Sequence, residues 1–221
     1  MDPKKIVAHG YDRIAERYAE WAPTVREEER EHYTRVMLDS LPERAAVLEL
    51  GCGNGLPTTK RLVERFEVTA VDISGRQIAL ARQNVPEATF VHADMTTLEF
   101  PPASFDGVAA FYAIIHVPRE EHEPLLGSIV RSLRPGGPLV ATLGARSWTG
   151  EVEEDWLGTP MYFSHFDAET NRALVERAGL RLEGARVEIA DEDGVSIPFL
   201  WIVARKPRLG GASGEEGSQP D

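Results

Sequence analysis

A short apolar segment runs directly into a glycine-rich turn, and this arrangement constrains the fold more than any other feature of the chain. Residues 45–50 are mostly apolar, and three glycines follow at alternate positions, from Gly51 to Gly55. Four to eight apolar residues bounded by turn residues are typical of a buried parallel strand. Glycine lets the backbone turn sharply and approach a ligand closely. Pro57 suits the first turn of a helix. The segment therefore predicts a strand, a ligand-binding turn and a helix.

The glycine spacing and a neighbouring acid indicate the kind of ligand. The dinucleotide fingerprint is G-x-G-x-x-G, and its helix N-terminus faces a pyrophosphate. Here the spacing is G-x-G-x-G, and Glu49 stands two positions before Gly51. A carboxylate repels a pyrophosphate and attracts a cation. The sulfonium and ammonium groups of S-adenosylmethionine are such cations, so this cofactor is expected at the turn.

Two further acids follow the next two expected strands. Asp72 lies about 20 residues beyond the glycines, where an acid accepts both hydroxyls of an adenosine ribose. Alternatively, Asp72 caps the helix that begins near Ser74. Asp94 is suited to accept from the exocyclic amine of adenine, and Met95 to cover the ring face. Alternatively, Asp94 starts a turn and Met95 fills the core.

Strands and helices alternate along most of the chain. Strands are expected at residues 45–50, 68–71, 88–92, 105–112 and 139–143, and helices at 58–66, 75–84 and 119–133. This alternation predicts an α/β fold with a doubly wound, mostly parallel sheet. Residues 148–165 read as an irregular aromatic stretch. A helix over 167–178 and two strands over about 180–189 and 195–204, joined by a hairpin turn, are expected after it.

The first 41 residues are expected to form two helices. Apolar and aromatic residues from Ile6 to Tyr18 recur at helical spacing, and a charged helix follows Pro23. The first helix either packs its aromatic stripe on the domain or acts as a lid. We therefore divide the chain into a cap over 1–41, a domain over 42–206 with an acceptor-site insert at about 146–166, and a tail. The tail, residues 207–221, is rich in glycine, serine and acids, so we expect it to be disordered.

Charge and cysteine content exclude several classes of protein. The chain of 221 residues has 24 Lys and Arg against 36 Asp and Glu, a formal net charge of −12. This balance argues against nucleic acid as a partner, because phosphate-binding proteins display basic faces. The single cysteine, Cys52, excludes an internal disulfide framework, and the six histidines lack metal-ligand spacing. With no membrane-length apolar run and no signal peptide, a cytoplasmic protein without a bound metal is expected.

Taken together, the motifs resemble those of class I S-adenosylmethionine-dependent methyltransferases, and the resemblance covers residues 11–204. The matching motifs are Tyr11-Asp12-x-x-Ala15-x-x-Tyr18, Val47-Leu48-Glu49-Leu50-Gly51-Cys52-Gly53-Asn54-Gly55, Val71-Asp72-Ile73-Ser74, Ala93-Asp94-Met95, Phe105-Asp106-Gly107-Val108 and Leu133-Arg134-Pro135-Gly136-Gly137. The resemblance implies a Rossmann-like seven-stranded sheet whose final strand is antiparallel. It also gives Tyr11 and Tyr18 a lid role. Within the family, the chain most resembles small-molecule methyltransferases of bacterial biosynthesis.

The resemblance also implies a set of cofactor contacts. The residues expected to contact S-adenosylmethionine, or its product S-adenosylhomocysteine, are Tyr11, Tyr18, Glu49, Gly51, Cys52, Gly53, Asp72, Ile73, Gln77, Asp94, Met95 and Phe111.

A methyl acceptor should lie beyond the fourth strand. A sulfonium methyl is already activated, so the protein must mainly orient the acceptor and exclude water. A hydroxyl acceptor also loses a proton, and a histidine is suited to take it. His116, just past the fourth strand, and His165, in the aromatic stretch, are the two candidates, although a lone histidine is often structural. The walls of the acceptor pocket are expected to include Tyr112, Ile115, Trp148, Tyr162 and Phe163.

The available histidines favour methylation of an oxygen on a small molecule. Nitrogen or sulfur methylation, and a non-catalytic regulatory protein that binds S-adenosylmethionine, remain alternatives. A nicotinamide-dependent oxidoreductase shares the sheet and the ribose acid but lacks the third glycine. No heptad pattern calls for a partner, so the protein is expected to be a monomer or a homodimer.

Overall fold

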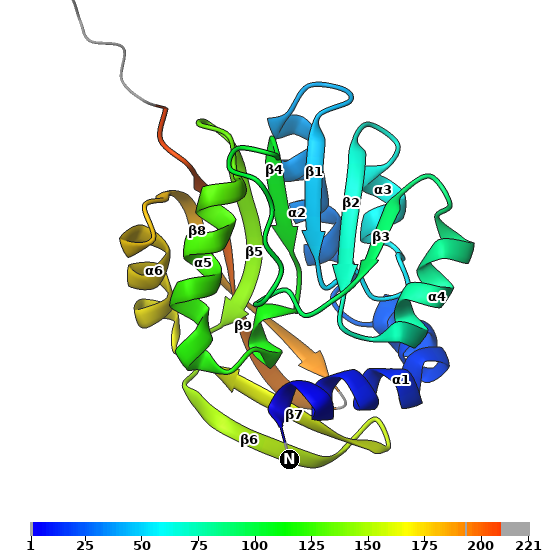
Figure 1. Ribbon diagram of the computed structural model, residues 1–221. Coiled ribbons are helices and arrows are strands. Elements are labelled where there is room, and N and C mark those ends of the chain that lie inside the picture. Colours follow the sequence, from blue (N-terminus) through cyan, green and yellow to red (C-terminus); the bar gives the residue numbers. More distant parts are fainter. Residues whose placement is uncertain (1, 193, 209–221) are drawn as a thin grey trace, which may run out of the picture.

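A seven-stranded sheet forms the centre of the computed structural model, which describes residues 2–192 and 194–208 (Figure 1). The strand order is β3-β2-β1-β4-β5-β9-β8. The strands are β1 (Ala46–Leu50), β2 (Glu67–Asp72), β3 (Thr89–His92), β4 (Gly107–Ala110), β5 (Pro138–Gly144), β8 (Arg181–Glu192) and β9 (Val195–Arg205). Strands β1 to β5 pair in parallel, whereas β9 is antiparallel to both β5 and β8. The predicted doubly wound sheet with an antiparallel final strand is confirmed.

Helices cover both faces of this sheet because its strands are apolar on both sides. The helices are α1 (Pro3–Trp21), α2 (Glu27–Ser40), α3 (Thr58–Leu62), α4 (Gly75–Asn84), α5 (His122–Ser132) and α6 (Ala168–Arg177), with short 3-10 turns at Ala22–Thr24, Ile114–His116 and Arg119–Glu121. Alternate side chains of a strand point to opposite faces. Leu48 therefore packs in the core under α5 and α6, while Val47 packs in the core under α2, α3 and α4.

Several elements are shorter than the sequence pattern predicts. The expected helix over 58–66 ends at Leu62, and the expected helix over 119–133 begins with a 3-10 turn before α5. The expected strand over 105–112 shortens to β4. Its carboxyl end is fixed by Tyr112, whose φ of 54° lies in the left-handed region. A tyrosine rarely adopts this conformation, so the surrounding structure must hold it there.

The prediction of an irregular stretch over residues 148–165 is wrong. These residues form a second, two-stranded sheet of β6 (Trp148–Trp156) and β7 (Thr159–His165). Leu157 and Gly158 join the strands, and both have positive φ, of 51° and 87°. Two such residues make the type I′ turn that matches the twist of a hairpin. The acidic residues of β6 face solvent and only β7 is buried, so the sequence pattern did not indicate two strands.

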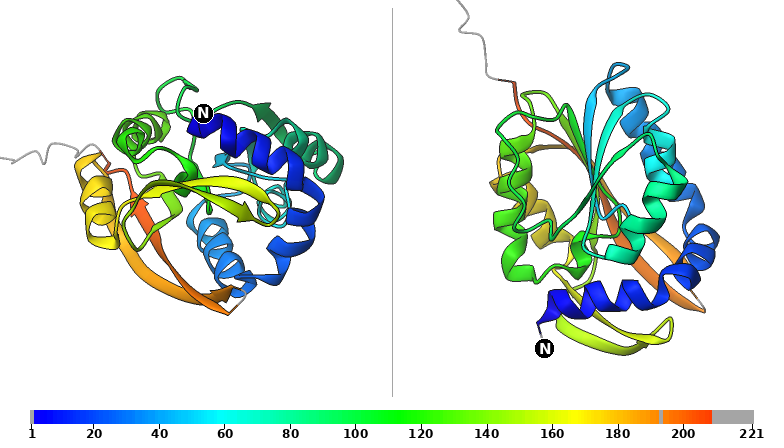
Figure 2. Two further views of the ribbon diagram at one scale, coloured as in Figure 1. Left: turned by 90° about the horizontal axis from the view of Figure 1, so that it is seen from below. Right: turned by 45° about the vertical axis from the view of Figure 1, so that its right-hand side comes forward.

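Helix α1 and the β6–β7 hairpin lie together at the carboxyl end of the parallel strands (Figure 2). Val7 and Ile14 of α1 pack against Met161 and Tyr162 of β7. Gly10 permits this approach, since a Cβ there would lie 2.8 Å from the Met161 side chain. The first helix thus packs its apolar stripe on the protein and also covers the end of the sheet where ligands of such folds bind.

Two further expectations concern the C-terminal tail and membrane-spanning helices. The predicted disorder of the tail falls mainly on residues 209–221, which lie outside the described residues. Among the described residues, no helix combines the length and the apolar character that a membrane span requires.

Candidate cofactor and acceptor site

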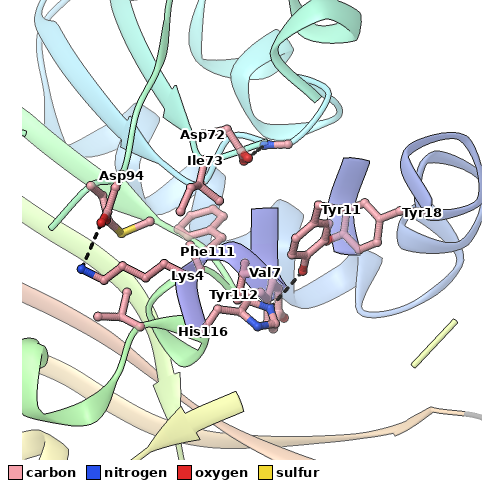
Figure 3. A pocket seen from close by; sticks show the side chains of 15 residues that line it. Lys4, Val7, Tyr11, Tyr18, Asp72, Ile73, Asp94, Phe111, Tyr112 and His116 are labelled. Carbon is pink, nitrogen blue, oxygen red and sulfur yellow. Dashed lines mark hydrogen bonds and ion pairs between the residues drawn. The ribbon is translucent and has the colours of Figure 1, made fainter. Parts of the chain in front are cut away.

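A pocket lies where α1 meets the carboxyl ends of the parallel strands (Figure 3). Its lining residues are Lys4, Val7, Tyr11, Tyr18, Gly51, Gly53, Asp72, Ile73, Asp94, Met95, Phe111, Tyr112, Ala113, His116 and Val117. The sequence predicted all of them as site residues except Lys4, Val7, Ala113 and Val117. The strands, the glycine turn and the cap helix thus bring together residues that lie up to 113 positions apart.

The glycine turn has the geometry that its sequence requires. Gly51, Gly53 and Gly55 have φ values of 75°, 54° and 80°, all in the left-handed region. The Gly51 N–H donates to the Val71 carbonyl at 2.8 Å, which ties the turn to β2. A Cβ on Gly51 would lie 2.2 Å from the Cβ of Ala113. Any side chain at position 51 would therefore displace the segment that follows β4.

Asp72 holds the glycine turn and faces the pocket. Its Oδ2 accepts from the Gly53 N–H at 2.8 Å, and its Oδ1 accepts from the Ser74 N–H at 2.9 Å. Ser74 itself caps α4 by accepting from the Gln77 N–H. Burial raises the pKa of Asp72, and the two N–H donors only partly offset this effect. Each carboxylate oxygen retains a free lone pair, so the side chain can still accept from ribose hydroxyls.

Glu49 lies beneath the turn and Cys52 lies within it, and neither residue lines the pocket. Glu49 is 4% exposed, and its Oε2 accepts from the Thr59 hydroxyl at 2.6 Å. Burial raises the pKa of Glu49 to about 8. A cation bound above the turn would favour the ionised carboxylate and lower this pKa.

Gln77 provides a test of whether the residues present fit an adenosyl cofactor. Both atoms of its side-chain amide are buried without a hydrogen-bond partner. Its Oε1 lies 3.9 Å from the point that a Cβ on Gly53 would occupy, just behind the turn. A buried polar group without a partner is costly, and the amino or carboxylate group of a ligand over the turn would relieve that cost. With Asp72 and Asp94 at the strand ends, the donors and acceptors match the cofactor.

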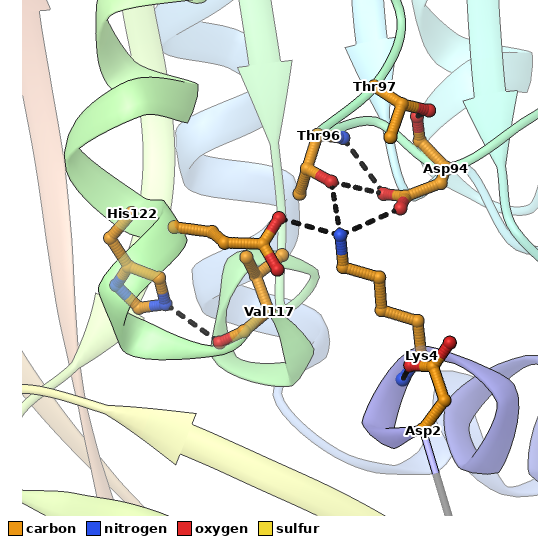
Figure 4. Close-up of polar contacts among 8 residues, drawn as sticks. Asp2, Lys4, Asp94, Thr96, Thr97, Val117 and His122 are labelled. Carbon is orange, nitrogen blue, oxygen red and sulfur yellow. Dashed lines mark hydrogen bonds and ion pairs between the residues drawn. The ribbon is translucent and has the colours of Figure 1, made fainter.

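Lys4 ties α1 to the pocket, and the sequence pattern did not single it out (Figure 4). Its Nζ lies 3.0 Å from Asp94 Oδ2 and 2.6 Å from Glu121 Oε2, and it donates to the Thr96 hydroxyl. Burial lowers the pKa of Lys4, but the hydrogen bonds to Glu121 and Asp94 outweigh burial and raise it overall. Asp94 also accepts from the Thr96 N–H at 2.9 Å. This contact agrees with the alternative in which Asp94 starts a turn.

His116 lines the pocket, and both of its ring nitrogens are engaged. Nδ1 lies 2.8 Å from the Tyr162 carbonyl oxygen, and Nε2 lies 2.9 Å from the Tyr11 hydroxyl. Because a carbonyl only accepts, Nδ1 carries the proton and Nε2 accepts from Tyr11. Burial lowers the pKa of His116 to about 4. The imidazole is therefore neutral at neutral pH.

The remaining candidates lie outside the pocket lining. The His165 ring contacts the Arg146 carbonyl through Nδ1, at 2.6 Å. Phe163 lies against the His116 ring, with 4.7 Å between ring centres. Ile115 and Tyr162 are buried, whereas Trp148 is 40% exposed. Of the expected acceptor-site residues, only His116 and Tyr112 line the pocket.

Four residues of α1 line the pocket: Lys4, Val7, Tyr11 and Tyr18. Tyr11 and Tyr18 meet edge to face, with ring centres 5.2 Å apart, and Trp156 of β6 contacts both. The remaining cavity measures about 70 Å³, whereas sites for drug-sized ligands measure roughly 300 Å³ or more. A ligand as large as an adenosyl cofactor therefore requires α1 or its side chains to move. Among the described residues, no group of three or more His, Cys, Asp or Glu side chains is arranged to hold a metal ion.

The central part of the chain is similar to a known family. A family described as a methyltransferase domain matches residues 47–137. The 27-O-demethylrifamycin SV methyltransferase of Amycolatopsis mediterranei is 34% identical over 122 residues, which are 51% of this chain and 44% of that protein. The malonyl-[acyl-carrier protein] O-methyltransferase of Enterobacter lignolyticus is 28% identical over 210 residues, 94% of this chain and 79% of that protein. This chain spans only 33% to 55% of the length of four other curated relatives.

Solved structures share the same fold. The N-methyltransferase NodS of Bradyrhizobium japonicum, determined in complex with S-adenosyl-L-homocysteine, aligns with a TM-score of 0.64 at 19% identity. The alignment covers 82% of this chain and 87% of NodS.

Proposed function

We propose that the chain is a class I S-adenosylmethionine-dependent methyltransferase and that it transfers the cofactor's methyl group to an oxygen of a small organic acceptor. One observation carries the proposal: Asp72, at the end of β2, binds the N–H of Gly53 in the turn that follows β1. This contact holds an acid and a glycine turn side by side at the strand ends, inside the segment that matches the family.

In this proposal, the cofactor lies over the glycine turn. Asp72 holds the ribose, Asp94 accepts from the adenine amine, and Ile73, Met95 and Phe111 contact the adenosine. Glu49, beneath the turn, balances the positive charge of the ligand. The bound cofactor supplies a methyl group that is already activated as a sulfonium. The protein's own part is then to orient the acceptor and exclude water, and α1 is placed to do both.

Tyr11 and His116 are proposed to handle the acceptor's proton. An acceptor oxygen next to Tyr11 donates its proton to the phenol oxygen, while the Tyr11 proton passes to His116 Nε2, 2.9 Å away. Because burial lowers the pKa of His116 to about 4, this base is weak. It suits an acidic acceptor such as a phenol better than an alcohol, whereas an acceptor that is already an ionised carboxylate needs no base. His165, outside the pocket lining, has no part in this proposal.

Two relatives support oxygen as the acceptor atom, because one is named for 27-O-demethylrifamycin SV and the other is named an O-methyltransferase of malonyl-[acyl-carrier protein]. The net charge of −12 supports a small molecule rather than a nucleic acid. We expect a cytoplasmic monomer or homodimer.

Calorimetric titration tests the proposal directly. The full chain is titrated in parallel with S-adenosylmethionine, S-adenosylhomocysteine and NAD. Both adenosyl ligands should bind and NAD should not. Binding of NAD alone, or of none of the three, would overturn the proposal. Methyl transfer is then assayed with phenols, carboxylic acids, amines and thiols, and transfer only to nitrogen or sulfur would contradict the proposed acceptor atom.

A further inference from the structure

Strand β8 forms one edge of the large sheet, away from the pocket (Figure 2). It pairs with β9 and with no other strand of the described residues. Unpaired backbone N–H and C=O groups on an edge strand can pair with another chain, so natural edges are usually short, covered or charged. Strand β8 has twelve residues, which is longer than most strands. Its individual residues therefore decide whether this edge is protected or paired.

The first half of the edge is protected, and the second half is open. A bulge between Leu182 and Gly184 interrupts the regular pairing, and bulges are a common protection of edges. Arg172 of α6 donates to the Ala185 carbonyl at 3.4 Å. This bond is longer than an ordinary hydrogen bond, so a second strand can displace it. Beyond Ala185, no side chain of the described residues bonds to the backbone of β8.

Apolar side chains are exposed along the open half. Val187 is 41% exposed and Ile189 is 66% exposed. Alternate residues of a strand point to the same face, so Ala185, Val187 and Ile189 form one apolar row at the edge of the sheet. The helices that cover the rest of the sheet leave this row accessible. An exposed apolar row beside an open strand edge is typical of a surface that another strand covers.

The opposite face of the same segment carries one positive and one negative charge. Arg186 and Glu188 flank Val187 and point to the other face. Burial raises the pKa of the Tyr33 phenol of α2, Glu188 raises it further, and Arg186 acts in the opposite direction. Both charges therefore lie on the side of the sheet that α2 covers. The ion pairs of β8 lie elsewhere on the strand, and no described residue pairs with either charge.

The order of these residues makes the segment complementary to itself. In an antiparallel pair of two copies with a two-fold axis at Val187, each residue before Val187 faces the residue equally far after it in the other copy. Arg186 of each copy then faces Glu188 of the other. The neutral residues also face one another: Val187 faces Val187, Ala185 faces Ile189, and Gly184 faces Ala190. Charges and apolar side chains therefore match in a single register.

We propose that β8 pairs with β8 of a second copy of this chain, antiparallel and centred on Val187, over residues 184–190. Opposite charges directly across two strands stabilise the pair, whereas like charges destabilise it. Moving the axis by one residue would set Arg186 or Glu188 opposite its own copy, so the charges select the register. The bulge lies just outside the paired segment. No pocket-lining residue of the described structure lies on β8, so each copy keeps its whole site.

Sedimentation velocity of the full chain over a wide range of concentrations tests the proposal. The single variants are Arg186→Glu and Glu188→Arg, and they are measured separately, in an equimolar mixture, and combined in one double variant. Arg181→Glu is the matched control. Arg181 lies on the same strand with 72% of its side chain exposed, but outside the proposed pair. Far-ultraviolet circular dichroism checks that each variant is folded.

Wild type should sediment as a dimer that dissociates on dilution. Each single variant sets like charges opposite each other on both sides of the axis, so its dissociation constant should rise at least tenfold. The double variant exchanges the two charges and should return to within threefold of wild type. The mixture should form dimers although neither single variant does, because one presents two carboxylates and the other two guanidinium groups. Arg181→Glu should behave as wild type.

Four results would overturn the inference. They are a wild type that stays monomeric at every concentration, an assembly larger than a dimer, single variants that dimerise as wild type does, and a mixture that fails to recover the dimer. Recovery in the mixture does not arise from a folding defect, since two misfolded proteins do not repair each other. Should a single variant fail to fold, Val187→Lys replaces it, because two ammonium groups then meet at the axis and should raise the dissociation constant at least tenfold.

Discussion

Replacing Glu49 with glutamine should change how the stability of the protein depends on pH. Glu49 is buried on β1, and Thr59 donates a hydrogen bond to it that glutamine can still accept through its amide oxygen. The pKa of Glu49 is raised from an ordinary 4.5 to about 8, mainly by burial. Between these two values the folded chain binds more protons than the unfolded chain. Stability therefore falls as the pH rises through this window.

The size of the effect follows from the shift in pKa. One pKa unit corresponds to about 1.4 kcal/mol. At pH 7, Glu49 is ionised in the unfolded chain but mostly protonated in the folded chain. The free energy of unfolding is therefore about 3 kcal/mol lower at pH 7 than at a pH where Glu49 is fully protonated in both states. Glu49→Gln removes the ionisation. The difference in unfolding free energy between variant and wild type should therefore grow by about 3 kcal/mol from pH 5 to pH 7.5.

Urea unfolding at pH 5, 6, 7 and 7.5 measures this difference. Other titrating groups are shared by the two proteins, so their contributions cancel in the comparison. Glu67→Gln, at a position with 65% of its side chain exposed, is the matched control for the substitution itself. A constant difference for Glu49→Gln would refute the reasoning, since it would mean that the carboxylate titrates alike in the folded and unfolded chain. A bound ligand with an ammonium group should reduce the pH dependence if Glu49 balances its charge.

Three further predictions concern residues that line the pocket. Asp72→Ala should weaken S-adenosylhomocysteine binding by about 1–3 kcal/mol, the usual cost of losing hydrogen bonds to a charged group; unchanged affinity in calorimetry would contradict its ribose role. Lys4→Met removes the ion pair with Asp94, so hydrogen exchange of the α1 amides, measured by mass spectrometry, should be faster than in the wild type, while exchange in β5 should be unchanged. Equal α1 exchange rates in the variant and the wild type would show that Lys4 does not hold α1. Tyr11→Phe and His116→Gln should each slow methyl transfer at least tenfold, and the double variant should lose little more because the residues act as one unit; additive losses in a methyl-transfer assay would separate their roles.

Strands and helices with strong local patterns could be predicted from the sequence. The apolar run before Gly51 and the helix signals around Ser74 specify their conformations within a few residues. The β6–β7 hairpin could not be predicted in this way. Its outer strand is largely exposed and acidic, and its inner strand becomes buried only when α1 packs on it. That burial arises from contacts between residues about 150 positions apart.

The candidate site shows the same limit. Motif spacing placed Asp72, Asp94 and His116 at the pocket, because strand ends meet at one edge of the sheet. It did not show that Glu49 lies beneath the turn or that Lys4 reaches Asp94. Nor did the charged pattern of the second helix distinguish the buried Arg30 from exposed residues such as Arg35. These features depend on which face of a helix or strand meets another element.

The packing of α1 against the hairpin gives the protein a built-in optical reporter. Trp21, at the end of α1, and Trp156, at the end of β6, have ring centres 5.8 Å apart, and Tyr18 contacts both. Two indoles this close interact electronically, so lifting α1 by a few ångströms should change the ultraviolet circular dichroism and the tryptophan emission. Ligand entry should therefore be visible in the unlabelled protein, on the timescale at which it happens.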